Sequence, residues 1–455
     1  MVVQKFGGTS VADPDAIGRL IQIVRQARAR DGRGPAVVVS AMSGVTDTLL
    51  AVAATAGDGR IDEALPRIDE LRARHHAAAR ALAPAEAAAG LGTIIDTVVD
   101  DLVALARALS VLGEVSPRTL DVVAAAGELL SSRIVAAALA HAGVPAEWVD
   151  ARRAIITNGE HTRAVPLGDE TDAALRATAL AAIEAGRVPV LGGFVGSTKD
   201  GHTTTLGRGG SDYSGALVGA GIGAREIQIW TDVDGMLTAD PRIVAAPRLV
   251  PQLSFAEAAE LAYFGAKVLH PSTILPAIER NIPVRILNSR KPAGTGTLIT
   301  AEPSPSATPL TALACKRGLT VVDITSSRML MAYGFLRRVF EVFERYRTSV
   351  DVVTTSEVTV SVSIDERRHL DAIAEALSEI AQVSIEHEMA LLCAVGDRLR
   401  TEPAIAARCV GVLEEVPLRM ISQAASCRNI TVILREADLQ HAMERLHEEF
   451  FGVEA

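Results

Sequence analysis

The first 300 residues alternate short runs of β-branched and apolar residues with long alanine-rich segments, and this alternation limits the possible folds more than any other feature. Glycine, proline or polar residues bound the short runs, which are predicted strands at residues 2–6, 36–40, 188–195, 226–233 and 282–288. The segments between them, such as 118–142 and 211–219, have helical periodicity. Strands alternating with helices favour an α/β domain with a mostly parallel sheet covered by helices.

The pattern changes after residues 291–311, which concentrate proline, glycine, serine and threonine and indicate a boundary loop. Beyond it we expect two ferredoxin-like α+β modules of βαββαβ order. The first is predicted from strands at 319–326, 350–356, 358–364 and 383–388 with helices at 334–347 and 367–382. The second is predicted from strands at 390–395, 419–426 and 429–436 with helices at 403–416 and 438–451.

The predicted domains are therefore residues 1–300, 312–388 and 389–455. The second module ends before its last strand, which would leave an open sheet edge. We therefore expect the two modules to be intertwined, with a strand of the first completing the second. Two separate, self-contained sheets would contradict this.

Composition excludes several functional classes. A net charge of −10 disfavours a nucleic-acid partner, since such proteins usually carry a basic excess. The four cysteines form no CxxC or Cys/His spacing, so we expect reduced cysteines and no metal site. His75 and His76 are expected on an exposed, charged helix without metal-ligand partners. No basic and apolar leader and no apolar run of about 20 residues is apparent, which predicts a cytoplasmic protein without a membrane partner.

The first segment with chemical potential is Lys5-Phe6-Gly7-Gly8-Thr9-Ser10, directly after the first predicted strand. Paired glycines allow close approach of a ligand, and backbone N–H groups leading into a helix suit an anionic oxygen. Lys5 adds a positive charge. The same residues also occur in ordinary strand-to-helix turns, and the chain has no GxxxxGK[ST] phosphate loop.

The second segment, Gly207-Arg208-Gly209-Gly210-Ser211-Asp212, precedes a predicted helix. Ser211 can be a helix cap only, but the planar fork of Arg208 suits a carboxylate or phosphate. Three further segments, 40–46, 127–128 and 230–235, are each more often structural than functional when taken singly. Residues 219–224 fit the dinucleotide pattern GxGxxG/A, but they follow a helix rather than a strand, so we reject an NAD site.

Together these segments resemble the aspartate kinases of the amino acid kinase family, with tandem ACT modules at the C-terminal end. The matching motifs are KFGGTSV (5–11), SAMSGVT (40–46), GELLSSR (127–133), GGFVGS (192–197), TTTLGRGGSD (203–212), WTDVDG (230–235), DPR (240–242), FGAKVLHP (264–271) and, in the ACT pair, TTSEVTVSVSID (354–365). The resemblance implies transfer of the γ-phosphate of ATP, with Mg²⁺, to the β-carboxylate of L-aspartate. This would be the first step of lysine, threonine and methionine biosynthesis.

The resemblance also implies residue roles. Lys5 would contact the transferring phosphate and Asp212 would orient Lys5, while Arg208 and Glu128 would hold the α-carboxylate and ammonium group of aspartate. The remaining implied substrate contacts are Thr46, Phe194 and Ser211, and the implied phosphate and nucleotide contacts are Gly7, Gly8, Thr9, Ser10, Thr231, Asp232, Arg242 and Lys267.

The chain most resembles the class of aspartate kinases that lysine inhibits. The resemblance implies an effector site at Met329, Phe335, Leu336, Ser349, Val350, Asp351, Ser356 and Glu357. Members of the single-function, lysine-inhibited class usually have His-Ser-Arg before Gly334, whereas this chain has Met331-Ala332-Tyr333, so weaker inhibition or a different effector is also compatible with the sequence.

Two competing functions stay open at this point: a sibling acetylglutamate or glutamate kinase, and a non-catalytic amino-acid sensor. A homodimer through the ACT modules is the default expectation, with a tetramer as the second possibility. No fused homoserine dehydrogenase is expected.

Overall fold

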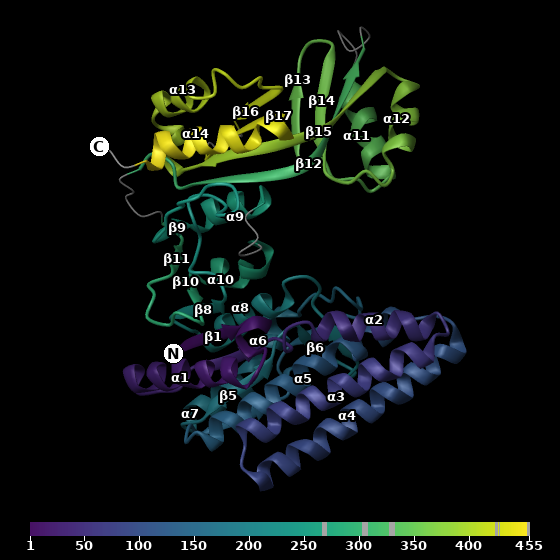
Figure 1. Cartoon of the computed structure of the whole chain (residues 1–455), viewed down its shortest axis with the longest axis vertical. Helices are drawn as coiled ribbons and strands as arrows, with labels where there is room; N and C mark the ends of the chain where they lie inside the picture. The colour runs from purple at the N-terminus through teal and green to yellow at the C-terminus, as the bar shows by residue number, and fades with distance from the viewer. Residues whose placement is uncertain (266–270, 303–307, 327–332, 424–425, 427, 453–455) are drawn as a thin grey trace. The chain divides into compact units, whose positions relative to one another are not determined.

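The computed structural model describes residues 1–265, 271–302, 308–326, 333–423, 426 and 428–452. The chain forms two compact units (Figure 1). The N-terminal unit comprises Met1–Met236 and Leu269–Ala301, and the C-terminal unit comprises Leu237–Val268 and Glu302–Ala455.

The N-terminal unit is built on a largely parallel sheet with the strand order β3-β5-β2-β1-β8-β10-β11. Among these described pairings, only β10–β11 is antiparallel. The strands of the sheet are β1 (Val2–Phe6), β2 (Ala36–Val39), β3 (Ala146–Val149), β5 (Val188–Gly192), β8 (Glu226–Thr231), β10 (Val284–Asn288) and β11 (Thr297–Thr300). A small second sheet holds β4 (Ile156–Thr157), β6 (Val195–Thr198) and β7 (Thr203–Thr205).

Helices cover both faces of the large sheet. They are α1 (Pro14–Asp31), α2 (Val45–Gly57), α3 (Ile61–Leu82), α4 (Ala85–Leu112), α5 (Pro117–His141), α6 (Gly168–Leu175), α7 (Ala181–Glu184), α8 (Gly210–Ile222) and α10 (Leu275–Glu279), with a π-helical stretch at Arg176–Leu180 and a 3₁₀ turn at Gly8–Val11. The long helices α3 and α4 lie side by side (Figure 1), linked by Arg72 and Asp96 at 2.9 Å.

Side chains of successive β1 residues point to opposite faces of the sheet. Phe6 belongs to the buried core with α1, whereas the Lys5 side chain lies against α8, where a Cβ on Gly215 would be 3.1 Å from the Lys5 Cβ. Neighbouring residues of β1 therefore face two different environments, one on each side of the sheet.

Helix α5 is long and apolar enough to cross a membrane, contrary to the expectation that no such segment exists. However, 83% of its apolar window is buried inside the fold, so it is a core helix of this unit. His75 also differs from the expectation of an exposed helix. It is fully buried on α3, where its Nδ1 lies 2.7 Å from the Leu71 carbonyl oxygen.

The C-terminal unit contains one antiparallel six-stranded sheet with the order β13-β14-β12-β15-β17-β16. The two modules expected from the sequence do not form separate sheets, because the 14-residue strands β12 and β15 run through both halves. The elements are β9 (Gln252–Ser254), α9 (Phe255–Tyr263), β12 (Ala312–Thr325), α11 (Phe335–Arg345), β13 (Val352–Thr355), β14 (Thr359–Ile364), α12 (Leu370–Ser378), β15 (Gln382–Val395), α13 (Pro403–Gly411), β16 (Met420–Gln423), β17 (Asn429–Arg435) and α14 (Leu439–Phe451).

The compact units do not follow the expected boundary at residue 300, because residues 237–268 pack with the C-terminal unit. Ile243 and Val244 belong to its hydrophobic core. The Asn429 side-chain amide donates to Glu260 at 2.6 Å, and the Leu313 N–H donates to the Thr238 carbonyl at 2.8 Å. The segment thus takes its packing from residues that lie far away in the sequence.

Candidate active site

A cavity of about 520 Å³ in the N-terminal unit gathers most of the site residues predicted from the sequence. It lies at the carboxyl ends of β1, β2 and β8, where ligands gather in open parallel sheets. Its lining includes Lys5, Gly7, Gly8, Thr9, Thr46, Glu128, Phe194, Arg208, Ser211, Asp212, Thr231 and Asp232.

Lys5 and Asp212 form an ion pair at one wall of the cavity, with Nζ and Oδ1 2.6 Å apart. Their side chains are only 10% and 19% exposed. Asp212 lies in the first turn of α8, where a carboxylate is also favoured by the helix dipole. The pair therefore holds the Lys5 ammonium in one place at the edge of the cavity.

Glycines allow the loops to approach one another closely. Gly209 precedes α8 with a φ of 72°, a left-handed conformation that favours glycine. A Cβ on Gly8 would lie 3.2 Å from the Ala41 carbonyl oxygen, so the first two loops touch through their backbones. Phe194 has a φ of 64° although it is not glycine, and its N–H donates to the Ser214 hydroxyl at 2.8 Å. Such backbone strain gathers at functional sites.

Glu128 is buried on α5 and lines the same cavity. Burial raises the pKa of its carboxyl group to about 8, although the Ala41 N–H and the charge of Lys5 lower it. One carboxylate oxygen, Oε2, has no hydrogen-bond partner in the described part of the chain. The site therefore contains a buried carboxyl group, and a bound cation would favour its charged form.

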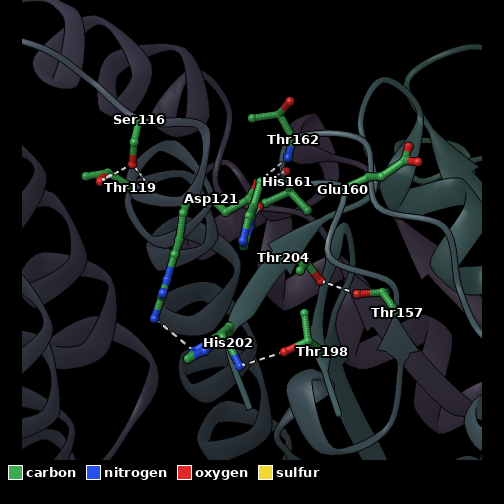
Figure 2. A network of polar contacts seen from close by, with 12 residues as sticks. Ser116, Thr119, Asp121, Thr157, Glu160, His161, Thr162, Thr198, His202 and Thr204 are labelled. Atoms are coloured by element: carbon green, nitrogen blue, oxygen red, sulfur yellow. Dashed lines mark hydrogen bonds and ion pairs between the residues drawn. The ribbon is translucent and has the colours of Figure 1, made fainter. Parts of the chain in front are cut away.

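A polar network supports the loop that carries Arg208 (Figure 2). Asp121, fully buried on α5, accepts hydrogen bonds from the Thr205 hydroxyl at 2.5 Å and from the Thr162 N–H at 2.9 Å. Its other oxygen lies 2.6 Å from Nδ1 of His161. Thr205 ends β7 and lies shortly before Arg208, so Asp121 ties α5 to the start of this loop.

Arg74 on α3 connects two loops of the cavity from outside. Its guanidinium donates to the carbonyl oxygens of Ser43 and Ala12, each at 2.9 Å. Sequence reasoning missed Arg74, the Asp121 network and the cavity-lining Asp47. For Asp47, its place directly after Thr46 in the SAMSGVT segment could have indicated it, whereas the other contacts connect distant segments and leave no local pattern.

Two predicted nucleotide contacts, Ser10 and Arg242, do not line the described cavity. The buried Ser10 hydroxyl donates to Ser289 at 2.8 Å and to the Trp230 carbonyl at 3.3 Å, away from the cavity lining. Arg242 belongs to the C-terminal unit, where it is exposed and pairs with Asp240 at 2.5 Å. Lys267 lies outside the described residues.

The predicted effector positions lie in the C-terminal unit around α11 and β13. Phe335 is buried, and Val350 packs against the same hydrophobic cluster. Leu336, Ser349, Ser356 and Glu357 are exposed or partly exposed, while Met329, Met331 and Ala332 lie outside the described residues. Asp351 pairs with Lys316, whose Nζ lies 3.0 Å from the Asp351 carboxylate and 2.6 Å from that of Asp365.

Comparison with known proteins identifies the family. The model of the amino acid kinase family matches residues 1–288, and an ACT domain model matches residues 392–450. The chain is 36% identical to the lysine-sensitive aspartokinase 3 of Escherichia coli and 37% identical to the chloroplastic aspartokinase 3 of Arabidopsis thaliana. Each match covers 99% of this chain, with 99% and 81% of the respective relatives.

The fold agrees with solved structures of this family. The crystal structure of E. coli aspartokinase III in complex with aspartate and ADP superposes with a TM-score of 0.83 at 35% identity, covering 99% of this chain and 100% of that one. The same enzyme in complex with lysine and aspartate gives a TM-score of 0.82, covering 99% of both chains. The expected family, fold class and enzyme class are thereby confirmed. The chain belongs to the amino acid kinase family and, within it, to the aspartokinases, which are ATP-dependent kinases that phosphorylate aspartate.

Proposed function

We propose that the cavity around Lys5 binds L-aspartate and the phosphates of ATP, and transfers the γ-phosphate to the β-carboxylate of aspartate. The observation that carries this proposal is the gathering of the Lys5–Asp212 pair, Glu128 and Arg208 around one cavity. The β-carboxylate is already a nucleophile, so the reaction needs positioning and neutralisation of charge rather than a strong base.

An α-amino acid requires one cationic and one anionic contact. In the proposed complex Arg208 binds the α-carboxylate and Glu128 receives the ammonium group, with Thr46, Phe194 and Ser211 beside them. Lys5 and the backbone around Gly7, Gly8 and Thr9 hold the transferring phosphate, and Asp212 keeps the Lys5 ammonium in position.

Thr231 and Asp232 are the proposed nucleotide contacts at the end of β8. The roles of Ser10, Arg242 and Lys267 rest on the family resemblance alone. In the described part of the chain, no three His, Cys, Asp or Glu side chains gather as a metal site. Mg²⁺ fits this cavity nonetheless, because it is usually held by phosphate oxygens and one or two carboxylates. Asp232 can supply one such carboxylate.

Regulation by lysine through the C-terminal unit is the second part of the proposal, supported by the lysine-sensitive E. coli relative and its complex with lysine. Asp351 and Glu357 would receive the two ammonium groups of lysine. We also propose a cytoplasmic homodimer joined through the C-terminal units, as ACT sheets commonly pair across a two-fold axis, and a place at the start of lysine, threonine and methionine synthesis.

The test is ADP release from Mg-ATP with aspartate, glutamate or acetylglutamate, with and without lysine or threonine. We expect turnover with aspartate only and suppression by lysine. Lys5→Ala should lower kcat by roughly a hundredfold or more, the usual effect of losing one preorganised charge donor. Turnover with glutamate or acetylglutamate instead would assign a sibling kinase, whereas lysine binding without any turnover would assign a sensor.

A further inference from the structure

A second cavity of about 700 Å³ lies on the opposite face of the same sheet from Lys5. Helix α1, strands β1, β8 and β10 and the turn at 292–295 line it, and it shares no lining residue with the active-site cavity. Gln4 and Trp230 are at its inner wall, and both are buried. None of the roles proposed for the aspartate kinase reaction uses this cavity.

The inner wall contains a chain of hydrogen bonds whose direction is fixed. The Trp230 indole can only donate, and it donates to Oε1 of Gln228 at 3.3 Å. Gln228 Nε2 donates to the Glu226 carboxylate at 2.7 Å, which can only accept when ionised. The atom of Gln4 that faces Gln228 Oε1 at 2.9 Å must therefore be its amide nitrogen.

This direction leaves the carbonyl oxygen of Gln4 as a free acceptor. Gln4 is 1% exposed, and its Oε1 has no partner in the part of the chain that the structure describes. Buried acceptors are almost always hydrogen-bonded to protein or to water, so an acceptor that the protein leaves unused in a cavity wall can accept from a water molecule or from a ligand that displaces it.

The mouth of the cavity is basic. Arg30, Arg225 and Arg285 line it, and Glu226 is the single carboxylate among its described lining residues. Arg30 and Arg225 are 61% and 56% exposed, although both also contact Asp31, and Arg285 pairs with Glu226 at 3.3 Å. Guanidinium groups in this arrangement suit a carboxylate or phosphate.

We propose that this cavity binds a small organic anion, with its carboxylate or phosphate at the arginines and a neutral hydrogen-bond donor at Oε1 of Gln4. Ile23, Leu287 and Trp230 provide an apolar wall for the body of the ligand. The ligand would touch residues next to the active site, because Gln4 precedes Lys5 and Trp230 precedes Thr231. The Gly7 N–H also donates to the Trp230 carbonyl at 3.0 Å.

The experiment uses Trp230 as the reporter. The chain has two tryptophans, so Trp148→Phe leaves Trp230 as the only indole. The probes are trans-4-hydroxycyclohexanecarboxylate and glycerol 3-phosphate, and the control probe is cyclohexanecarboxylate, which lacks the donor. We expect a saturable change in fluorescence with the hydroxy acid or with the phosphate, and the probe that saturates shows which of the two anions the cavity binds. Cyclohexanecarboxylate, which lacks the hydroxyl, should bind at least about tenfold more weakly than the hydroxy acid.

Matched variants complete the test in the Trp148→Phe background. Arg28 and Arg30 both lie in the last turn of α1, but only Arg30 lines the cavity. Arg30→Ala should weaken binding about tenfold, and Arg28→Ala should leave it unchanged. Gln4→Met should remove the preference for the hydroxy acid. The proposal is overturned if neither probe saturates, if both arginine variants act equally, or if a folded Gln4→Met protein keeps the preference.

Discussion

Burial raises the pKa of the Glu128 carboxyl group to about 8, so this side chain is mostly protonated at pH 7 in the free protein. An ammonium group at Oε2 favours the charged carboxylate and must displace that proton. We therefore expect aspartate binding at pH 7 to release most of one proton. Affinity should rise with pH between about 6 and 8, by up to about tenfold per unit, and level off above about 8.

Calorimetry in two buffers with different ionisation enthalpies measures this proton release. Glu128→Gln is the matched control, since it keeps the shape of the side chain but cannot ionise. It should bind aspartate weakly and without proton release. A wild-type protein that binds aspartate at pH 7 without releasing a proton would contradict the role of Glu128.

Arg74 holds two loops of the active-site cavity from helix α3. Its guanidinium donates to the carbonyl oxygens of Ala12 and Ser43. Ala12 follows the first cavity loop, and Ser43 lies in the second. Arg74→Leu should raise the KM for aspartate about tenfold, since two charge-assisted hydrogen bonds that position these loops are lost. Arg72→Leu, on the same helix but paired with Asp96 and Asp100, should leave the KM unchanged. Equal effects of the two variants would indicate a general effect on α3.

Asp121 joins three elements of the N-terminal unit: α5, the loop at 158–165 and β7 (Figure 2). In Asp121→Asn the amide oxygen can still accept from Thr205 and Thr162, but an NH2 group replaces the oxygen that faces Nδ1 of His161, so the charge of the network is lost and His161 must change tautomer to keep a partner. We expect a loss of about 1–3 kcal/mol in stability and a larger rise in the KM for aspartate than fall in kcat, because Arg208 follows β7. Steady-state kinetics and thermal melting measure the two effects.

Asp150→Asn serves as the control for Asp121→Asn. Asp150 is a mostly buried carboxylate in the same unit, but it pairs with Arg152 and does not line the active-site cavity. It should lower the melting temperature without changing the KM for aspartate. If Asp121→Asn changed stability alone, its proposed effect on the Arg208 loop would be wrong.

The sequence predicted the helices and strands, and the meeting of the active-site loops, better than it predicted how distant segments pack together. The segments that contain Gly7, Thr46 and Asp232 lie at the ends of parallel strands, and such strands bring their carboxyl ends to one edge. Residues 237–268 pack with the C-terminal unit although the amino acid kinase family model also spans them, and local turn signals do not tell which core a segment joins. Likewise, the strand predicted at 319–326 is the second half of β12, which begins at Ala312 and has a register shift between Lys316 and Leu319, where Gly318 has a φ of 72°.

Long-range polar contacts were equally hidden. Asp121 and His161 are 40 residues apart, and nothing in either local pattern points to the other. His75 was expected to be exposed because charged residues surround it in the sequence. Helical spacing instead places it on the buried face of α3, between charged neighbours that face outward. Burial is a property of the assembled unit, so one local window could not predict it.

Regulation involves the whole molecule, since an effector bound to the C-terminal unit must change the activity of the N-terminal unit. Here the Asp351 carboxylate that would receive lysine already holds the ammonium group of Lys316, which also pairs with Asp365. Burial raises the pKa of Asp351, while Lys316 lowers it. The side chain of Lys316 thus presents to Asp351 the same chemical group as the proposed effector, and the two should compete.

Removing Lys316 should therefore increase sensitivity to lysine. We expect Lys316→Met to lower the half-inhibitory lysine concentration about three- to tenfold, which corresponds to at most about 1.4 kcal/mol for this partly exposed pair. Lys316→Arg keeps the charge and should stay near wild type. Lysine titrations of ADP release and of binding by calorimetry measure the change. If inhibition weakened in Lys316→Met while binding weakened in parallel, Lys316 would support the effector site instead of competing for it.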